Sequence, residues 1–274
     1  MIKTIELKNS ELEYRLTGEG QSETILFLHG LGANLSQFQH QHQYFDKDYQ
    51  VISVNLRGHG RSRVLRRPNP AAFELSKMAL DVIELLEVLG INQVNFVGNS
   101  MGGNVGYEIL KLKPSLFSSF TTFGTTAQLS TSEITFKIMK YTYIILNTKT
   151  IGNLAKAAGQ TDTSREKIKE MMSHINRPIL LSILPNIANF NYLDVIKTSS
   201  VPSIIIKGEF DKDINKALES TIVEFKHRGN FKIVEMENVG HFANLDNPDR
   251  FNRVLAEFID KKSKTMARLT PSAH

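Results

Sequence analysis

Short apolar segments alternate with segments of helical periodicity along most of the chain. The short segments have the length of strands, and they cover residues 2–8, 11–17, 24–29, 49–56, 93–97, 117–123, 203–206 and 231–236. Apolar residues at helical spacing predict helices over residues 36–45, 73–89, 104–110, 216–225 and 249–259. Strands separated by helices predict an α/β fold with a mostly parallel, eight-stranded sheet that is flanked by helices.

The strand pattern stops near residue 125 and resumes after Pro202. The intervening stretch has helical and loop character, which predicts a helical cap, or lid, inserted into the core domain. In this division residues 1–125 and 201–262 form the core, and residues 126–200 form the cap.

The composition of the chain excludes several classes of protein. The 274 residues include no cysteine, so a disulfide framework, a thiolate metal site and a cysteine nucleophile are impossible. The N-terminus lacks the apolar core of a secretory signal, and no run of about eighteen apolar residues offers a membrane span. We therefore expect a cytoplasmic protein without stable membrane insertion, either a monomer or a homodimer.

Part of the formal net charge of +5 lies in an arginine-rich stretch, residues 57–67, and part in the C-terminal tail. Both are predicted to be solvated, because no aromatic residues interleave with the charges in a nucleic-acid-binding pattern. No nucleic-acid partner is predicted. The tail, residues 263–274, lacks a core pattern, and we expect it to be disordered.

The sequence lacks the usual motifs for cofactors and metals. The glycines at positions 98, 102 and 103 match neither the G-x-G-x-x-G spacing of a dinucleotide loop nor the G-x-x-x-x-G-K-[ST] spacing of a phosphate loop. There is no H-E-x-x-H pattern and no cysteine–histidine cluster. We therefore predict neither a cofactor nor a metal.

Residues 98–102 read Gly-Asn-Ser-Met-Gly and stand between a predicted strand and a predicted helix. A serine between glycines at such a turn matches the nucleophile elbow pattern G-x-S-x-G, in which a tight turn exposes the serine oxygen. The start of the helix also leaves backbone N–H groups unpaired, and these can hold an oxyanion. Ser100 is therefore the candidate nucleophile.

A serine nucleophile needs a base, and the base needs an acid that orients it. In proteins with this elbow, the catalytic residues occur along the chain in the order serine, acid, histidine. The acid and the histidine each follow a later strand. Asp211, just beyond the strand at 203–206, is the preferred acid, and Glu209 and Asp213 are alternatives. His241 follows the strand at 231–236 and is the candidate base.

The loop after the strand at 24–29 reads His-Gly-Leu-Gly over residues 29–32. This composition predicts an oxyanion loop, with the Leu31 N–H as one donor and the Met101 N–H as the other. His29 and His59 are predicted to be structural hydrogen-bonding residues.

Five motifs in this order resemble the α/β-hydrolase superfamily, specifically its single-domain members with a helical cap. They are His-Gly-Leu-Gly at 29–32, Arg-Gly-His-Gly-Arg-Ser at 57–62, Gly-Asn-Ser-Met-Gly-Gly at 98–103, Gly-Glu-Phe-Asp at 208–211 and Gly-His-Phe at 240–242. The resemblance spans roughly residues 5–260. It implies Ser100 as nucleophile, His241 as base, Asp211 as acid, and the amides of Leu31 and Met101 as the oxyanion hole.

The resemblance also bears on the substrate. A serine at position 100 argues against the aspartate-nucleophile branches, the haloalkane dehalogenases and epoxide hydrolases. Residues 98–103 look like the corresponding run of C–C bond hydrolases that act on ring-cleavage products, and Arg177 lies where those enzymes place a carboxylate-binding arginine. Those enzymes carry tryptophan after the catalytic histidine, whereas this chain has Phe242 and no tryptophan. Arg177 and Phe242 are the candidate substrate-binding residues.

The function predicted first is a serine carboxylesterase for small to medium apolar esters, with an acyl-enzyme intermediate and a small-molecule substrate. The alternative within the same chemistry is a C–C bond hydrolase or a lactonase with the same triad. The alternative of another class is a non-catalytic receptor that uses the hydrolase pocket only to bind a ligand.

Overall fold

The computed structural model describes residues 1–65, 69–226, 228 and 230–269. Its strands are β1 (Ile2–Glu6), β2 (Ser10–Thr17), β3 (Thr24–Leu28), β4 (Gln50–Val54), β5 (Arg63–Val64), β6 (Val94–Asn99), β7 (Phe117–Phe123), β8 (Gln128–Ser130), β9 (Asn189–Asn191), β10 (Ser203–Gly208) and β11 (Phe231–Met236). Its α-helices are α1 (Gln39–Phe45), α2 (Leu75–Val88), α3 (Met101–Leu112), α4 (Glu133–Ile145), α5 (Thr148–Ala155), α6 (Asp162–Ser173), α7 (Arg177–Ala188), α8 (Leu193–Thr198), α9 (Lys212–Ala217), α10 (Glu219–Lys226), α11 (Ala243–Asp246) and α12 (Pro248–Leu269). Short 3-10 helices are η1 (Leu35–Phe38), η2 (Pro70–Phe73), η3 (Pro114–Leu116) and η4 (Lys156–Ala158).

One large sheet organises the described part of the chain. Its order is β1-β2-β4-β3-β6-β7-β10-β11, and the two-residue strand β5 pairs with β2. Neighbours from β4 to β11 are parallel, whereas β2 is antiparallel to β1, β4 and β5. Strands β3 and β6 are buried along their whole length, which explains their continuous apolar runs. The predicted mostly parallel sheet of eight strands is confirmed, with β5 as an addition.

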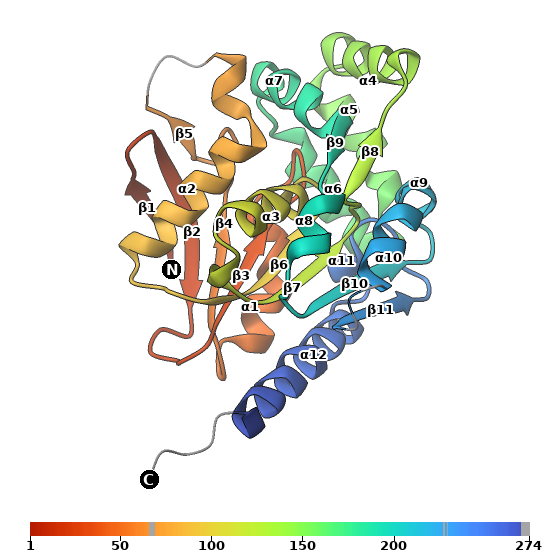
Figure 1. The fold of residues 1–274 in the computed structure, drawn as a ribbon. Helices are drawn as coiled ribbons and strands as arrows, with labels where there is room; N and C mark the ends of the chain where they lie inside the picture. Colours follow the sequence, from red (N-terminus) through yellow and green to blue (C-terminus); the bar gives the residue numbers. More distant parts are fainter. Residues whose placement is uncertain (66–68, 227, 229, 270–274) are drawn as a thin grey trace.

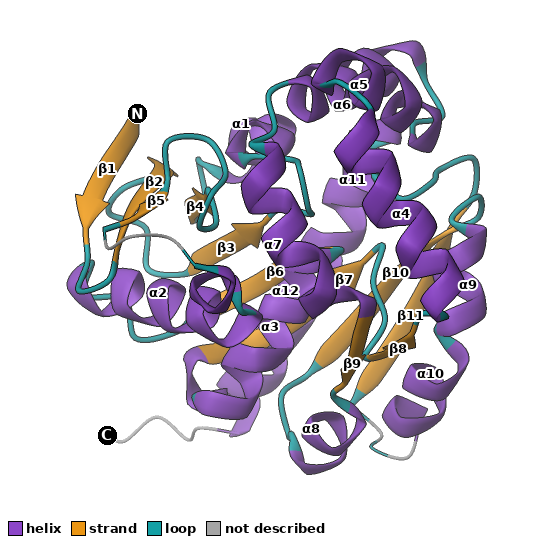
Figure 2. Cartoon of the chain, turned by 90° about the horizontal axis from the view of Figure 1, so that it is seen from above, coloured by secondary structure: helices purple, strands orange, loops and turns teal. Residues whose placement is uncertain are grey.

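Helices cover both faces of this sheet (Figure 1, Figure 2). Successive side chains of a strand point to opposite faces, so β3 contributes to two cores. Leu26 and Leu28 pack in a cluster with residues of α2 and α3. Ile25 and Phe27 pack in a second cluster with residues of α1 and α12. The two clusters hold the strands rigidly, so the loops at the strand ends start from fixed positions.

The chain between β7 and β10 forms the segment predicted as a cap. It contains α4 to α8 and a small antiparallel sheet of β8 and β9. Figure 1 shows α4, α5 and α7 above one end of the large sheet. This end is the carboxyl edge of the parallel strands. Gly32 and Gly58 lie in the loops that follow the carboxyl ends of β3 and β4. A side chain added at either glycine would collide with Met172 or Ile179, so the segment lies directly against these loops. The division of the segment between β7 and β10 from the core, as a separate cap domain, stays a prediction.

Two charged segments differ from expectation. Arg57 is only 4% exposed and forms a buried ion pair with Asp81 of α2, so its assignment to a solvated loop was wrong. Arg61 and Arg63 are exposed, as predicted, and Arg66 and Arg67 lie outside the described residues.

Helix α12 continues to Leu269, so residues 263–269 are helical where we expected disorder, and residues 270–274 lie outside the described residues. Lys264, Met266, Ala267, Arg268 and Leu269 are good helix formers, which explains the extension.

Candidate active site

Ser100 stands at a strained turn between β6 and α3. Its backbone has φ 51° and ψ −121°, a left-handed conformation that residues with a side chain seldom adopt. The Ser100 N–H donates to the Phe123 carbonyl (3.0 Å), and the Ser100 carbonyl accepts from the N–H groups of Gly103 (2.9 Å) and Asn104 (3.2 Å). These three bonds hold the turn in place, so the geometry of a nucleophile elbow is present at the predicted position.

The glycines of the elbow allow α3 to approach the sheet closely. A Cβ atom at Gly98 would lie 2.7 Å from the Cα of Gly103, and one at Gly102 would lie 2.2 Å from the Leu28 carbonyl oxygen. Both contacts are with backbone atoms, which cannot rotate away as a flexible side chain does. Only glycine fits at these two positions.

Gly102→Ala is therefore expected to lower the free energy of unfolding by about 2 kcal/mol, a typical cost of overpacking a close contact. Urea unfolding followed by circular dichroism measures this change. Ser115→Ala, at an exposed position in η3, is the control and should change the free energy by less than about 0.5 kcal/mol. Equal stability of Gly102→Ala and the control would contradict this account of the elbow.

The candidate acid and base meet at the carboxyl ends of β10 and β11. Asp211 follows β10 at the start of α9, and His241 follows β11 just before α11. The Asp211 Oδ2 lies 2.9 Å from His241 Nδ1, and the side chains are 10% and 25% exposed. Glu209 instead accepts a hydrogen bond from the Asn238 N–H (2.8 Å). Among the three candidate acids, the structure therefore pairs Asp211 with the histidine.

Asn99 connects the histidine loop to the elbow. Its Nδ2 donates to the carbonyl oxygens of His241 (3.1 Å) and Phe123 (3.2 Å), and its Oδ1 accepts from Gln37 Nε2 (3.0 Å). Asn99 is fully buried and immediately precedes Ser100, so the bond places the His241 backbone beside the elbow. This contact was not predicted from the sequence, where Asn99 contributes only to the likeness of residues 98–103 to C–C bond hydrolases.

Gln37 belongs to a chain of buried amide side chains behind the histidine loop. Its Nε2 also donates to Asn244 Oδ1 (3.2 Å), and Asn244 Nδ2 donates to Gln41 Oε1 (3.1 Å). Gln41 Nε2 in turn donates to Asn252 Oδ1 (2.8 Å) on α12. Because buried amides need partners, this chain fixes the orientation of the Asn99 amide.

The loop after β3 passes directly beside the elbow. A Cβ atom at Gly30 would lie 3.1 Å from the Cβ of Ser100. Among the described residues, the backbone hydrogen bonds of loops and turns include none donated by Leu31 or Met101. Both amides are thus available as donors near the serine. Their role as the oxyanion hole stays a prediction.

Two buried histidines hold this loop in shape. His59 Nε2 accepts from the Gly32 N–H (3.1 Å), and His29 Nε2 accepts from the Leu56 N–H (3.1 Å). Burial lowers the pKa of His59 to about 4 and the pKa of His29 well below its ordinary value. Both rings are therefore neutral at pH 7 and act as structural hydrogen-bonding groups.

Comparison with known proteins agrees with this architecture. The sequence matches the family model described as alpha/beta hydrolase fold over residues 23–248, which is most of the chain. The chain belongs to this family. The match confirms the resemblance predicted from the five sequence motifs and supports assignment to a family of hydrolases.

Curated relatives and solved structures of the family are similar over nearly the whole chain. The chain is 23% identical over 268 residues to (E)-2-((N-methylformamido)methylene)succinate hydrolase of Acinetobacter baylyi, covering 94% of this chain and 98% of the relative. It is 25% identical over 259 residues to 3-oxoadipate enol-lactonase 2 of the same organism, covering 92% and 94%. The crystal structure of the enol-lactonase from Burkholderia xenovorans has a TM-score of 0.81 at 20% identity and covers 94% of this chain and 100% of that one.

Of the two predicted substrate-binding residues, Arg177 lies in the segment between β7 and β10, called the inserted segment below, and Phe242 packs against that segment. Arg177 Nε donates to the Tyr143 carbonyl (3.0 Å), and Arg177 Nη2 donates to the Ile144 carbonyl, at the end of α4. An arginine on the last carbonyls of a helix satisfies groups that lack intrahelical partners. Phe242 is 6% exposed and packs in a cluster with residues of α5 and α6. Their contact with substrate stays a prediction.

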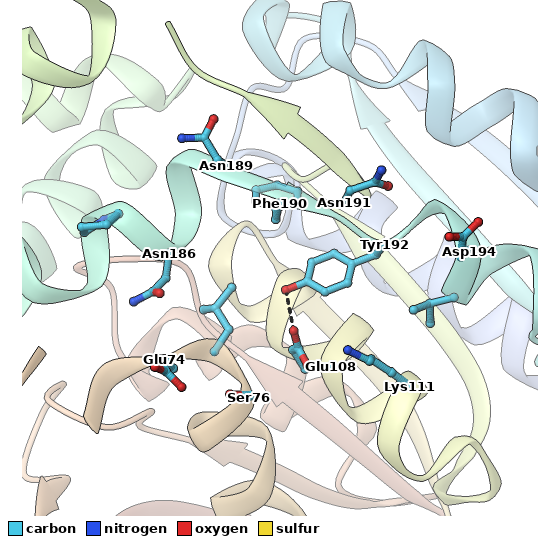
Figure 3. Close-up of a pocket in the computed structure, with 13 residues that line it drawn as sticks. Glu74, Ser76, Glu108, Lys111, Asn186, Asn189, Phe190, Asn191, Tyr192 and Asp194 are labelled. Carbon is cyan, nitrogen blue, oxygen red and sulfur yellow. Dashed lines mark hydrogen bonds between the residues drawn. The ribbon is translucent and has the colours of Figure 1, made fainter. Parts of the chain in front are cut away.

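Two cavities lie where the inserted segment meets the core. One has a volume of about 540 Å³ and lies between α2, α3 and residues 185–195. Figure 3 shows the Tyr192 hydroxyl of that segment bonded to Glu108 of α3 (3.0 Å). Neither Ser100 nor the Asp211–His241 pair lines this cavity. The other, of about 270 Å³, adjoins the loop after β3 at Gly32.

The described residues offer neither a cluster of metal ligands nor a membrane-spanning helix. They contain no group of three or more histidine, cysteine or carboxylate side chains that could hold a metal ion. They also contain no helix that is both long and apolar enough to cross a membrane. The prediction that the protein needs no metal stays a prediction.

Proposed function

We propose that this chain is a serine hydrolase that cleaves carboxylic esters through an acyl-enzyme. One observation carries the proposal: Asp211 is hydrogen-bonded to His241 (2.9 Å), and Asn99 joins the backbone of His241 to the strained Ser100 turn. A serine, a histidine and an acid in this arrangement form the constellation that activates a hydroxyl for attack.

In the first half-reaction Ser100 Oγ attacks the ester carbonyl carbon and its proton passes to His241 Nε2. Asp211 occupies Nδ1, so Nε2 is the nitrogen left to accept that proton. The tetrahedral intermediate then expels the alkoxide, which takes the proton from His241 and leaves as an alcohol. The acyl group remains on Ser100.

In the second half-reaction a water molecule gives a proton to His241 and attacks the acyl carbon. Collapse of the second tetrahedral intermediate releases the carboxylic acid, and the proton returns to Ser100 Oγ. The N–H groups of Leu31 and Met101 stabilise the oxyanion in both halves, an effect worth about 3 kcal/mol for each donor.

The cavity beside the loop after β3 adjoins the candidate oxyanion loop at Gly32, although neither Ser100 nor His241 lines it. Its apolar lining comes from Met171, Ile175 and Ile179 of the inserted segment. Arg61 and Arg63 also line it, but each pairs with a carboxylate, Glu13 (2.6 Å) and Glu11 (2.9 Å) respectively. Asn34, His174 and Asn176 line it as well, so the cavity has mixed polarity. The preference for small to medium apolar acyl groups rests on the sequence and is part of the proposal.

A lactone is the second candidate substrate, and the relative named as an enol-lactonase favours it. A lactone is a cyclic ester, so the same steps apply. The leaving oxygen stays attached to the acyl group, and water releases a hydroxy acid, or its keto form from an enol lactone. The C–C bond reaction uses the same serine and histidine, with a carbon leaving group in place of the oxygen.

A substrate panel tests the proposal. Purified protein is assayed with nitrophenyl esters of increasing acyl length, with simple lactones, and with a dienoic keto-acid of the ring-cleavage type. We expect turnover of short and medium esters or of lactones, with no activity in Ser100→Ala. Turnover of the keto-acid far above every ester and lactone would instead select the C–C reaction, and equal turnover by Ser100→Ala would overturn the serine mechanism.

A further inference from the structure

Asp246, the last residue of α11, is a buried carboxylate with three hydrogen-bond donors from two different parts of the molecule. Its Oδ2 accepts from the Gly240 N–H (2.8 Å), in the residue just before His241. Its Oδ1 accepts from the Gln160 N–H (2.7 Å) and the Ser164 hydroxyl (2.5 Å), both in the inserted segment. The residue is 8% exposed, so these donors replace the water that an ionised carboxylate would otherwise bind.

The inserted segment also packs directly against the histidine loop. A Cβ atom at Gly240 would lie 2.8 Å from the Ala158 carbonyl oxygen and 2.9 Å from Gln160 Nε2. Phe242, which follows His241, and Leu245 of α11 pack in one apolar cluster with Ile168 and Met172 of α6. Figure 2 shows α11 below the end of the molecule formed by α5 and α6. Asp246 therefore lies at the contact between α6 and the loop.

The backbone around His241 is held on both sides. Asn99 Nδ2 donates to the His241 carbonyl (3.1 Å), and Asp246 accepts from the N–H of the preceding residue (2.8 Å). Asp211 holds the ring through Nδ1 (2.9 Å). The bonds made by Asn99 and Asp211 join residues of the core. Of the three residues, only Asp246 also accepts hydrogen bonds from the inserted segment, at Gln160 and Ser164.

We propose that Asp246 is a positioning residue that couples the inserted segment to the placement of the catalytic histidine. The inference rests on the proposed function of Ser100 and His241. If α6 and the preceding residue Gln160 move away together, the Asp246 Oδ1 loses both of its donors. Asp246 then reorients toward other donors or water, its bond to Gly240 weakens, and the His241 ring loses its alignment with Ser100. Productive alignment and a seated inserted segment thus occur together.

Two substitutions test the α6 side and the histidine side of this contact one at a time. Ser164→Ala removes the hydroxyl that α6 donates to Asp246 and changes no atom of Gly240 or of the triad. Asp246→Asn keeps the size of the side chain, but its amide group presents N–H toward a donor. The matched control is Thr161→Ala, which removes the other side chain of the α6 capping box, a hydroxyl that accepts from the Ser164 N–H (3.1 Å).

The main measurement is the second-order rate of Ser100 labelling by a small fluorophosphonate, which reports serine activation without a substrate acyl group in the pocket. We expect a decrease of about tenfold or more in Asp246→Asn and about threefold in Ser164→Ala, because small misplacements of catalytic groups are costly. Thr161→Ala should stay within about twofold of wild type. Ester turnover should show the same order, with kcat reduced more than KM is raised.

The rate of hydrogen exchange at the Gly240 amide independently measures how well its bond to Asp246 is kept. Thermal unfolding measures the stability of each variant. We expect Ser164→Ala to speed exchange at Gly240 although the substitution lies on α6. Wild-type exchange and wild-type labelling in Ser164→Ala would overturn the coupling while leaving the serine mechanism intact. Labelling that falls equally in Ser164→Ala and Thr161→Ala would overturn it too, because general loosening of α6 would then explain both. A wild-type protein that is not labelled at Ser100 overturns the proposed function itself.

Discussion

Ser100→Ala is expected to reduce kcat for ester hydrolysis by about 10⁶-fold, the loss seen when the nucleophile of a serine hydrolase triad is removed. In this chain no cysteine can take over the attack. The amides of Leu31 and Met101 and the binding contacts remain in the variant, so a residual rate above that of water should persist. The backbone bonds of residue 100 use its N–H and carbonyl groups only, so alanine keeps the turn.

The expected loss of activity in Ser100→Ala must be distinguished from a loss of folded protein. Circular dichroism and thermal unfolding of Ser100→Ala should match wild type, and Ser115→Ala, an exposed serine in η3, should keep full activity. A fluorophosphonate should label wild type and Ser115→Ala but not Ser100→Ala. Labelling that persists in Ser100→Ala would identify a different nucleophile. Tight binding of an ester analogue by an unlabelled wild-type protein would favour the non-catalytic receptor instead.

Asp81→Ala is expected to lower the free energy of unfolding by about 3–5 kcal/mol, the cost of leaving one charge of a buried ion pair alone. Arg57 Nη2 donates to Asp81 Oδ1 (2.6 Å), Nε donates to Oδ2, and Nη1 donates to the Ala72 carbonyl (2.8 Å). The side chains are 5% and 3% exposed. After the substitution the guanidinium keeps its charge and loses its partner in a site that water does not reach.

Urea unfolding measures this effect against an exposed ion pair of the same protein. Lys3 and Glu19 are 36% and 60% exposed, so Glu19→Ala should cost less than about 1 kcal/mol. The double variant Arg57→Met with Asp81→Leu should recover most of the loss, because apolar residues need no compensating charge. A change below about 1 kcal/mol in Asp81→Ala would show that water or another group solvates the arginine.

Local sequence patterns determined most of the core fold. The buried strands of a parallel sheet are short apolar runs, and the helices between them bury one face at a regular spacing. The three-residue strands β8 and β9 and the two-residue strand β5 carry too few residues for a period to show. The continuation of α12 to Leu269 follows helix propensity, which a search for core patterns does not detect.

The elbow at Ser100 could be read from the sequence because glycine spacing is a local steric requirement, and His241 and Asp211 because parallel strands end at one edge. Which acid contacts His241, what Asn99 and Asp246 hold, and where Arg57 and Arg177 point were decided only by the tertiary structure. Each of these contacts joins residues distant in the chain. Sequence periodicity reports which side of an element is buried, but a buried polar group takes whichever partner the packing of other elements brings within hydrogen-bond distance.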